Sequence, residues 1–81
     1  NPFNPSTIIS YSVPEQTYVS IKVYDILGHE VTTLVNKEVN AGRYQITFDA
    51  SKVSGGLSSG VYFYTIKAGN FVATKKLLLT K

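Results

Sequence analysis

The sequence predicts an all-β fold, an antiparallel sandwich of about seven short strands. Apolar and polar residues alternate with a period of two along most of the chain, and no window shows the i, i+3, i+4, i+7 pattern of an amphipathic helix. Glycine-containing turn signals recur at short intervals, as in sandwiches and small barrels. The chain has 81 residues, 43% hydrophobic and 16% charged, which is enough for one compact domain spanning residues 1–81 and too little for a second. Helices should be absent or limited to a single turn.

The first two strands are predicted on either side of Pro14, which cannot donate a hydrogen bond to a ladder. Residues 7–13 are rich in β-branched side chains, and residues 17–24 alternate more cleanly. A turn at residues 25–28 closes the second strand. The residues expected to face the core are Ile9, Tyr11 and Val13 in the first strand and Val19, Ile21 and Val23 in the second.

The middle of the chain predicts two more strands and two loops. Residues 30–35 predict a strand, and the polar stretch 36–41, ending at Gly42, predicts a loop. Residues 43–49 resume the alternation and predict a central strand with Tyr44, Ile46 and Phe48 on one face. The segment 51–60, rich in serine and glycine, predicts a mobile loop that is too short to be an interdomain linker.

The last two strands predict a hairpin, residues 60–68 and 70–79, with a turn at Gly69-Asn70. Tyr62, Tyr64 and Ile66 are expected to face the core. Three consecutive leucines near the end of the chain cannot all face one side of a strand, so some must be covered by other elements, a bulge or a partner. The spacing of these elements best matches an immunoglobulin-like or fibronectin-III-like sandwich.

Charge and composition exclude several classes of protein. Eight Lys and Arg against five Asp and Glu give a net charge of +3, but the basic residues are scattered and only one is Arg, so we expect a solvated surface and no nucleic-acid partner. No apolar run is long enough for a transmembrane helix, so no stable membrane insertion is expected. The chain does not begin with Met or a signal peptide, and we therefore expect it to be excised from a larger protein.

The inventory of reactive side chains predicts no enzyme. There is no cysteine, and the single histidine, His29, follows Gly28 in a predicted turn without a serine and carboxylate spaced for a triad. The acids form no paired-carboxylate or calcium-loop pattern, and the glycines lack phosphate-binding spacing. We expect no catalytic residue, no cofactor and no metal. Tyr18 and Tyr24 lie on the polar side of their strand, where they suit either cross-strand pairing or a carbohydrate platform.

Five segments in chain order carry a resemblance that spans nearly the whole chain. The segments are NPFNPSTIISY at 1–11, VYDILGHEV at 23–31, AG at 41–42 with YQITFD at 44–49, SGVYFY at 59–64 and KKLLL at 75–79. In these segments the chain resembles the type A C-terminal sorting domain of the type IX secretion system. The middle segments are also similar to related immunoglobulin-like modules, including a domain of flagellar hook-capping proteins.

The resemblance implies a non-catalytic, seven-stranded sandwich at the end of a larger exported protein. Its cargo is fused on the N-terminal side, crosses the inner membrane by a separate signal and folds in the periplasm. An outer-membrane translocon then recognises the domain, and a sortase-like peptidase removes it. The cargo is secreted or remains at the cell surface, in some cases attached to lipopolysaccharide.

The resemblance also assigns roles to residues. Those expected to be recognised by the translocon are Gly60, Val61, Tyr62, Lys75, Lys76, Leu77, Leu78 and Leu79. The turn residues are Asp25, Gly28, Gly42 and Gly69. Gly55 and Gly56 depart from the family pattern by lengthening one loop.

Two interpretations of the terminal strand follow. If it docks to the translocon, truncation after Thr74 abolishes export of a folded domain, whereas if its leucines complete the core, the truncation unfolds the domain. Lys75 and Lys76 also suit an edge strand that is guarded against aggregation. The alternative functions are a spacer or accessory module of a secreted enzyme and a carbohydrate-binding module. Exposed sheet edges also allow a dimer.

Overall fold

The computed structural model describes residues 6–53 and 57–79, which form six strands and one short 3-10 helix. All the strand pairs are antiparallel. The strands are β1 (Ser6–Val13), β2 (Thr17–Tyr24), β3 (Glu30–Val39), β4 (Gly42–Asp49), β5 (Gly60–Ala68) and β6 (Phe71–Leu79). The single turn of helix, η1, covers Ala50–Lys52. The predictions of an all-β chain with no more than one turn of helix are confirmed.

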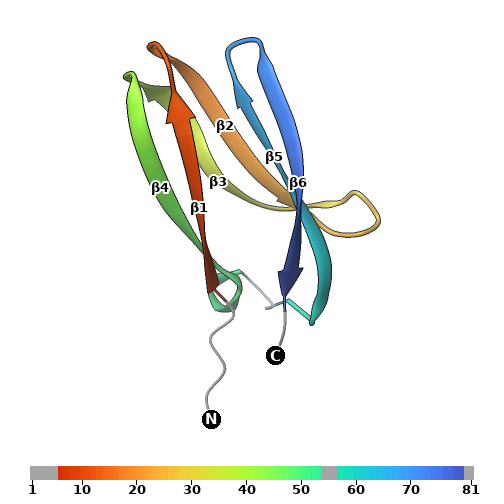
Figure 1. Cartoon of the computed structure of the whole chain (residues 1–81). Helices are drawn as coiled ribbons and strands as arrows, with labels where there is room; N and C mark the ends of the chain where they lie inside the picture. The colour runs from red at the N-terminus through yellow and green to blue at the C-terminus, as the bar shows by residue number, and fades with distance from the viewer. Residues whose placement is uncertain (1–5, 54–56, 80–81) are drawn as a thin grey trace.

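The strands form two sheets, one of two strands in the order β1-β4 and one of four in the order β3-β2-β5-β6. Figure 1 shows the β1-β4 pair as one layer and the larger sheet as the other, which is the arrangement of a sandwich. The larger sheet has the order C′-C-F-G of an immunoglobulin-type domain, and β1 and β4 then correspond to strands B and E. Chain order and sheet order therefore both agree with the predicted fold.

The core lies between the two sheets and is built from alternate residues of each strand. Val19, Ile21 and Val23 on β2 have no exposed surface, and Ile9 and Phe48 from the opposite sheet, 3% and 1% exposed, share one core cluster with Val23. Each such side chain contributes about 1.5–3 kcal/mol by leaving water. The predicted inward faces of β1, β2, β4 and β5 are confirmed, because each contains the buried residues of its strand.

Two predictions about the middle of the chain are wrong. The stretch predicted as a loop from residue 36 continues β3 as far as Val39, with Asn36, Lys37 and Glu38 paired to β2. Its polar side chains are exposed because β3 is the outermost strand of its sheet, where polar residues are tolerated. The strand predicted to be central, β4, pairs only with β1 among the described residues. The prediction failed because alternation shows that one face of a strand is buried and does not show how many strands pair with it.

The predicted loop after β4 begins with an ordered turn. Asp49 ends β4 and caps η1, with its Oδ1 accepting hydrogen bonds from the Ser51 amide at 2.9 Å and the Ser51 hydroxyl at 2.6 Å. These bonds from Ser51, aided by the charge of Lys52, lower the pKa of the Asp49 carboxyl. The rest of the predicted mobile loop includes Gly55 and Gly56, which lie outside the described residues.

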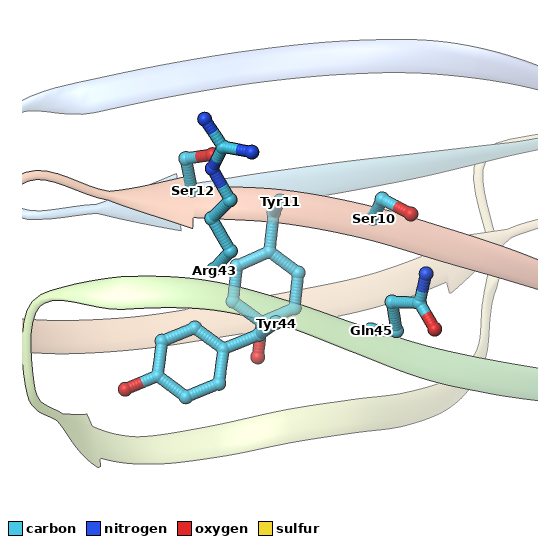
Figure 2. A pocket seen from close by; sticks show the side chains of 6 residues that line it. All are labelled: Ser10, Tyr11, Ser12, Arg43, Tyr44 and Gln45. Atoms are coloured by element: carbon cyan, nitrogen blue, oxygen red, sulfur yellow. The ribbon is translucent and has the colours of Figure 1, made fainter.

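Two tyrosines join β1 to β4 at the edge of the core. The rings of Tyr11 and Tyr44 stack with their centroids 5.4 Å apart, and the Tyr44 hydroxyl donates to the Asn40 carbonyl at 2.5 Å. Figure 2 shows these rings on one side of the β1-β4 pair and Ser12 and Arg43 pointing to the other side. These four residues, with Ser10 and Gln45, line an open hollow. Burial, and to a smaller extent the neighbouring Tyr44, raises the pKa of Tyr11.

Candidate functional site

The two segments assigned to recognition, SGVYFY and KKLLL, meet in the β5-β6 hairpin. Their residues are direct register partners, as the predicted hairpin with its turn at Gly69-Asn70 implies. The pairs are Gly60 with Leu79, Val61 with Leu78, Tyr62 with Leu77, Phe63 with Lys76 and Tyr64 with Lys75. The structure therefore brings all eight predicted recognition residues to one end of one hairpin.

The hairpin divides these residues between two faces. Tyr62, Leu77 and Leu79 point into the core, with 6%, 9% and 5% of their surface exposed. The Tyr62 hydroxyl also donates to the Ser58 carbonyl at 2.8 Å, which ties β5 to the loop before it. These three side chains therefore hold the fold and present little surface to a partner.

The outer face of the same hairpin end is accessible. Leu78 is 70% exposed and Lys76 is exposed beside it, while Lys75 is exposed on the other face of the strand. Val61, the register partner of Leu78, is half-buried. The run of three leucines thus needs no bulge, because β5 and β6 pair without a register shift and the middle leucine faces solvent. This exposure is consistent with docking, while the two buried leucines complete the core.

The turn between β2 and β3 lies beside this hairpin end and is held rigid by Asp25. The Asp25 Oδ1 accepts from the amides of Leu27 and His29, each at 2.9 Å. The Asp25 carbonyl accepts from the Gly28 amide at 3.0 Å, and Gly28 has a φ of 89°, which favours glycine. The predicted turn is confirmed, and its backbone is fixed by hydrogen bonds.

This turn exposes two large apolar side chains. Ile26 and Leu27 are 71% and 77% exposed. They line a hollow of about 340 Å³ together with the first residues of β5, including Val61. We call Ile26, Leu27, Val61 and Leu78 the hairpin-end patch. Sequence reasoning gave Ile26 and Leu27 no role, although two consecutive aliphatic residues inside a predicted turn are an available signal, since turns favour polar residues.

The other two predicted turn residues lie elsewhere. Gly42 begins β4 and pairs with Val13, and Gly69 lies in the β5-β6 turn. Both are at the end of the sandwich away from the β2-β3 turn (Figure 1). Gly69 has a φ of 61°, and a Cβ there would lie 3.1 Å from the Thr17 hydroxyl oxygen. These two glycines shape turns and do not belong to the hairpin-end patch.

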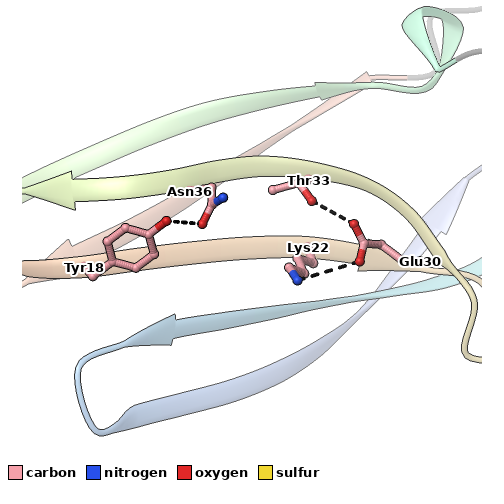
Figure 3. Close-up of polar contacts among 5 residues, drawn as sticks. All are labelled: Tyr18, Lys22, Glu30, Thr33 and Asn36. Atoms are coloured by element: carbon pink, nitrogen blue, oxygen red, sulfur yellow. Dashed lines mark hydrogen bonds and ion pairs between the residues drawn. The ribbon is translucent and has the colours of Figure 1, made fainter.

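The polar contacts on the outer face of the large sheet are local. Figure 3 shows Tyr18 bonded through its hydroxyl to Asn36, and Glu30 joined to Lys22 at 3.7 Å and to the Thr33 hydroxyl at 2.8 Å. These contacts link β2 to β3, so Tyr18 takes part in cross-strand pairing. The predicted carbohydrate platform at Tyr18 and Tyr24 stays a prediction.

The reactive groups remain dispersed. His29 Nδ1 lies 3.6 Å from Asp25 Oδ2 in an exposed turn. Among residues 6–53 and 57–79, no group of three His, Cys, Asp or Glu residues could hold a metal ion. Within the same ranges, no helix has the length and apolar character to cross a membrane.

Comparison with protein families gives one result that covers almost the whole chain. The model of a family described as a secretion system C-terminal sorting domain matches residues 1–80. Comparisons with curated proteins and with solved structures gave no match.

Proposed function

The chain belongs to the family of secretion system C-terminal sorting domains. We propose that the secretion machinery recognises it by binding the hairpin-end patch. The domain is a sorting signal for type IX secretion, and it directs an N-terminal cargo to the cell surface or beyond. Domains of this kind are typically non-catalytic. In this proposal the hairpin-end patch is the surface that the secretion machinery recognises.

The exposure of Leu78 carries the proposal. It lies between two core leucines on the last strand, yet 70% of its surface faces solvent. Its contact with a partner would remove apolar surface from water and contribute about 1.5–3 kcal/mol to binding. The adjoining side chains of Ile26, Leu27 and Val61 extend this apolar surface, and clusters of this kind mark interaction sites.

The surroundings of the patch support a specific partner. Lys76 lies on the outer face of β6, opposite Phe63, and Lys75 is exposed one residue earlier. None of the hydrogen bonds or ion pairs described above involves either ammonium group. A surface on the translocon that is apolar at its centre and acidic at its rim would complement both features. Gly60, Tyr62, Leu77 and Leu79 contribute by holding this end of the hairpin in place.

After recognition, the domain is removed from its cargo. A sortase-like peptidase cleaves between the cargo and residues 1–81, and the cargo is released or attached at the surface. In this scheme the domain is a single unit of 81 residues that catalyses nothing. A mature surface protein that retains residues 1–81 would instead support the role of a spacer.

Two substitutions on the same strand and the same face test the patch. A fluorescent cargo fused ahead of residues 1–81 carries Leu78→Ser in one version and Val72→Ser in the other, since Val72 is 59% exposed at the far end of β6. We expect Leu78→Ser to trap the cargo in the periplasm and Val72→Ser to leave export intact. Equal export of the two, with both domains folded by circular dichroism, would exclude the patch as the recognised surface.

A further inference from the structure

A groove of about 420 Å³ opens at the end of the sandwich away from the hairpin-end patch. It lies between the turn that joins β1 to β2 and the turn that joins β5 to β6, both at the same end of the molecule (Figure 1). Its volume is within the range of small-molecule sites and too small to receive a helix of a partner protein. The residues that line it all belong to the described part of the chain.

The two turns are joined to each other, which fixes the walls of the groove. The Gly69 amide donates to the Tyr18 carbonyl at 3.4 Å and thereby ties the β5-β6 turn to the start of β2. The Thr17 hydroxyl oxygen lies 3.1 Å from the position that a Cβ on Gly69 would occupy, so Thr17 packs directly against this glycine. A site with fixed walls loses little conformational entropy when it binds a ligand.

Phe71 provides an apolar surface in the groove, and 60% of it is exposed. Its side chain shares the alternation of Ala73 and Leu77, which pack in the core, so it lies on the inner side of β6. Burial of such a side chain is worth about 1.5–3 kcal/mol, which Phe71 largely forgoes. Pro14, from the other turn, adds a second exposed apolar surface. The groove therefore offers a flat aromatic ring to a ligand.

Polar side chains complete the lining. They are Ser12, Glu15, Thr17 and Asn70. Within residues 6–53 and 57–79, these four side chains make no hydrogen bond or ion pair. The two hydroxyls and the amide can each donate and accept hydrogen bonds, and the Glu15 carboxylate accepts them. The described lining contains no Lys or Arg, so a single carboxylate is its only charge.

This combination of groups determines the chemistry of the ligand. An anion is disfavoured because the only charge in the groove is negative. A purely apolar molecule would leave the hydroxyls and the amide without partners. A sugar ring suits both parts of the lining, because its C–H face packs on an aromatic ring and its hydroxyls both donate and accept hydrogen bonds. We propose that the groove binds a neutral sugar, stacked on Phe71 and hydrogen-bonded to Asn70 and Glu15.

A cation is the strongest competitor for this groove. An ammonium group would pair with the Glu15 carboxylate and lie over the Phe71 ring. The chain has a net charge of +3, however, which repels a cation at long range. A cation also offers no acceptor to the N–H groups of the Asn70 amide, whereas a sugar hydroxyl does. The neutral sugar is therefore favoured, and the experiment below separates the two.

The groove is separate from the other surfaces considered for this protein. Tyr18 and Tyr24, the residues predicted to form a carbohydrate platform, share one face of β2, opposite to its buried residues. Leu78 of the hairpin-end patch lies near the other end of β6. The sugar site goes beyond the proposed function, and it succeeds or fails independently of recognition by the secretion machinery.

NMR titration of the isotope-labelled 81-residue chain tests the site. The probes are the methyl glycosides of glucose, galactose, mannose and N-acetylglucosamine, each added up to about 50 mM so that millimolar binding is visible. We expect at least one of them to shift the amides of Glu15, Asn70 and Phe71 in a saturable way, with the β2-β3 turn unchanged. The absence of a saturable shift with all of the probes would overturn the proposal.

Matched substitutions identify the groups that bind. Phe71→Leu keeps an apolar side chain but removes the flat ring, so we expect about tenfold weaker sugar binding. Val72→Ala, on the opposite face of the same strand, should leave binding unchanged. A Phe71→Leu variant that is folded by circular dichroism and binds as tightly as the wild type would contradict stacking on the ring.

A charged probe distinguishes the sugar from a cation. Glu15→Gln keeps an acceptor oxygen, so sugar binding should stay within about threefold of the wild type. Butylammonium is added to both proteins under the same conditions. If it binds more tightly than every sugar and this binding is lost in Glu15→Gln, the groove is a cation site and the proposal is overturned.

Discussion

Val61 on β5 lies directly opposite Leu78 on β6, and the leucine is 70% exposed. The next pair along the hairpin, Tyr62 and Leu77, points the other way and is buried. One short hairpin end thus serves two purposes, because its inner face completes the core and its outer face is available for recognition. Substitutions on the two faces should have separable effects.

The inner face should control stability. Leu77→Ala removes a side chain that is 9% exposed from the cluster containing Ile9 and Phe48, and it leaves a cavity. We expect a loss of about 3 kcal/mol in the free energy of unfolding, measured by urea denaturation. Leu78→Ala is the matched control and should change stability by less than about 0.5 kcal/mol. Equal losses in the two variants would contradict the division into two faces.

Truncation of the chain within β6 should unfold the domain. Ending the chain after Thr74 removes Leu77 and Leu79 from the core together with half of β6. We therefore expect the truncated domain to be unfolded, with no cooperative thermal transition by circular dichroism. A truncated domain that melts cooperatively would show that these leucines are dispensable for the fold.

The β2-β3 turn should depend on the Asp25 carboxylate. Asp25→Ala leaves the Leu27 and His29 amides without their acceptor, so we expect a loss of about 1 kcal/mol in stability and faster exchange of these two amides. Asp25→Asn retains an acceptor oxygen and should lose less. If exchange of both amides were unchanged in Asp25→Ala, the carboxylate would not be what orders the turn.

The β5-β6 turn should reject a side chain at Gly69. Gly69→Ala places a Cβ 3.1 Å from the Thr17 hydroxyl oxygen at a φ of 61°, and we expect a cost of about 1–2 kcal/mol in unfolding free energy. Thr17→Ala removes the contact but not the backbone strain, so the double variant should recover part of the loss. A double variant no more stable than the sum of the single changes predicts would indicate that the contact is harmless.

The cap formed by Asp49 should make stability depend on pH. Its pKa is lowered from 3.8 by the Ser51 bonds, so the folded state binds the proton less tightly than the unfolded chain. The stabilisation is therefore present above pH 3.8 and lost as the pH falls through the lowered pKa. We expect the difference in melting temperature between the wild type and Asp49→Asn to shrink between pH 5 and pH 2. A constant difference over this range would contradict the assignment.

The sequence was sufficient for features that depend on one strand at a time. Alternation identified the buried residues of β2, and Gly69-Asn70 located the hairpin turn, because both signals are local. Features that depend on neighbouring strands were missed. The polar end of β3 is a strand because β2 pairs with it, and β4 has one partner within residues 6–53 and 57–79 although its alternation resembles that of a central strand.

The candidate site followed the same rule. Resemblance identified SGVYFY and KKLLL, and the predicted hairpin brought them together, whereas the division of their side chains between a buried and an exposed face is a property of the folded domain. The role of Ile26 and Leu27 could not be predicted, since it arises from the position of the β2-β3 turn beside the start of β5. Alternation predicted that the three leucines divide between faces, and only the pairing showed that Leu78 is the exposed one.

The most direct test of the central claim is the export of a fluorescent cargo fused ahead of residues 1–81, in a host with a type IX system and in its translocon mutant. The account predicts cargo at the surface only in the competent strain, and loss of that export with Leu78→Ser. Cargo that stays in the periplasm of a competent strain shown to export its own substrates would contradict the account.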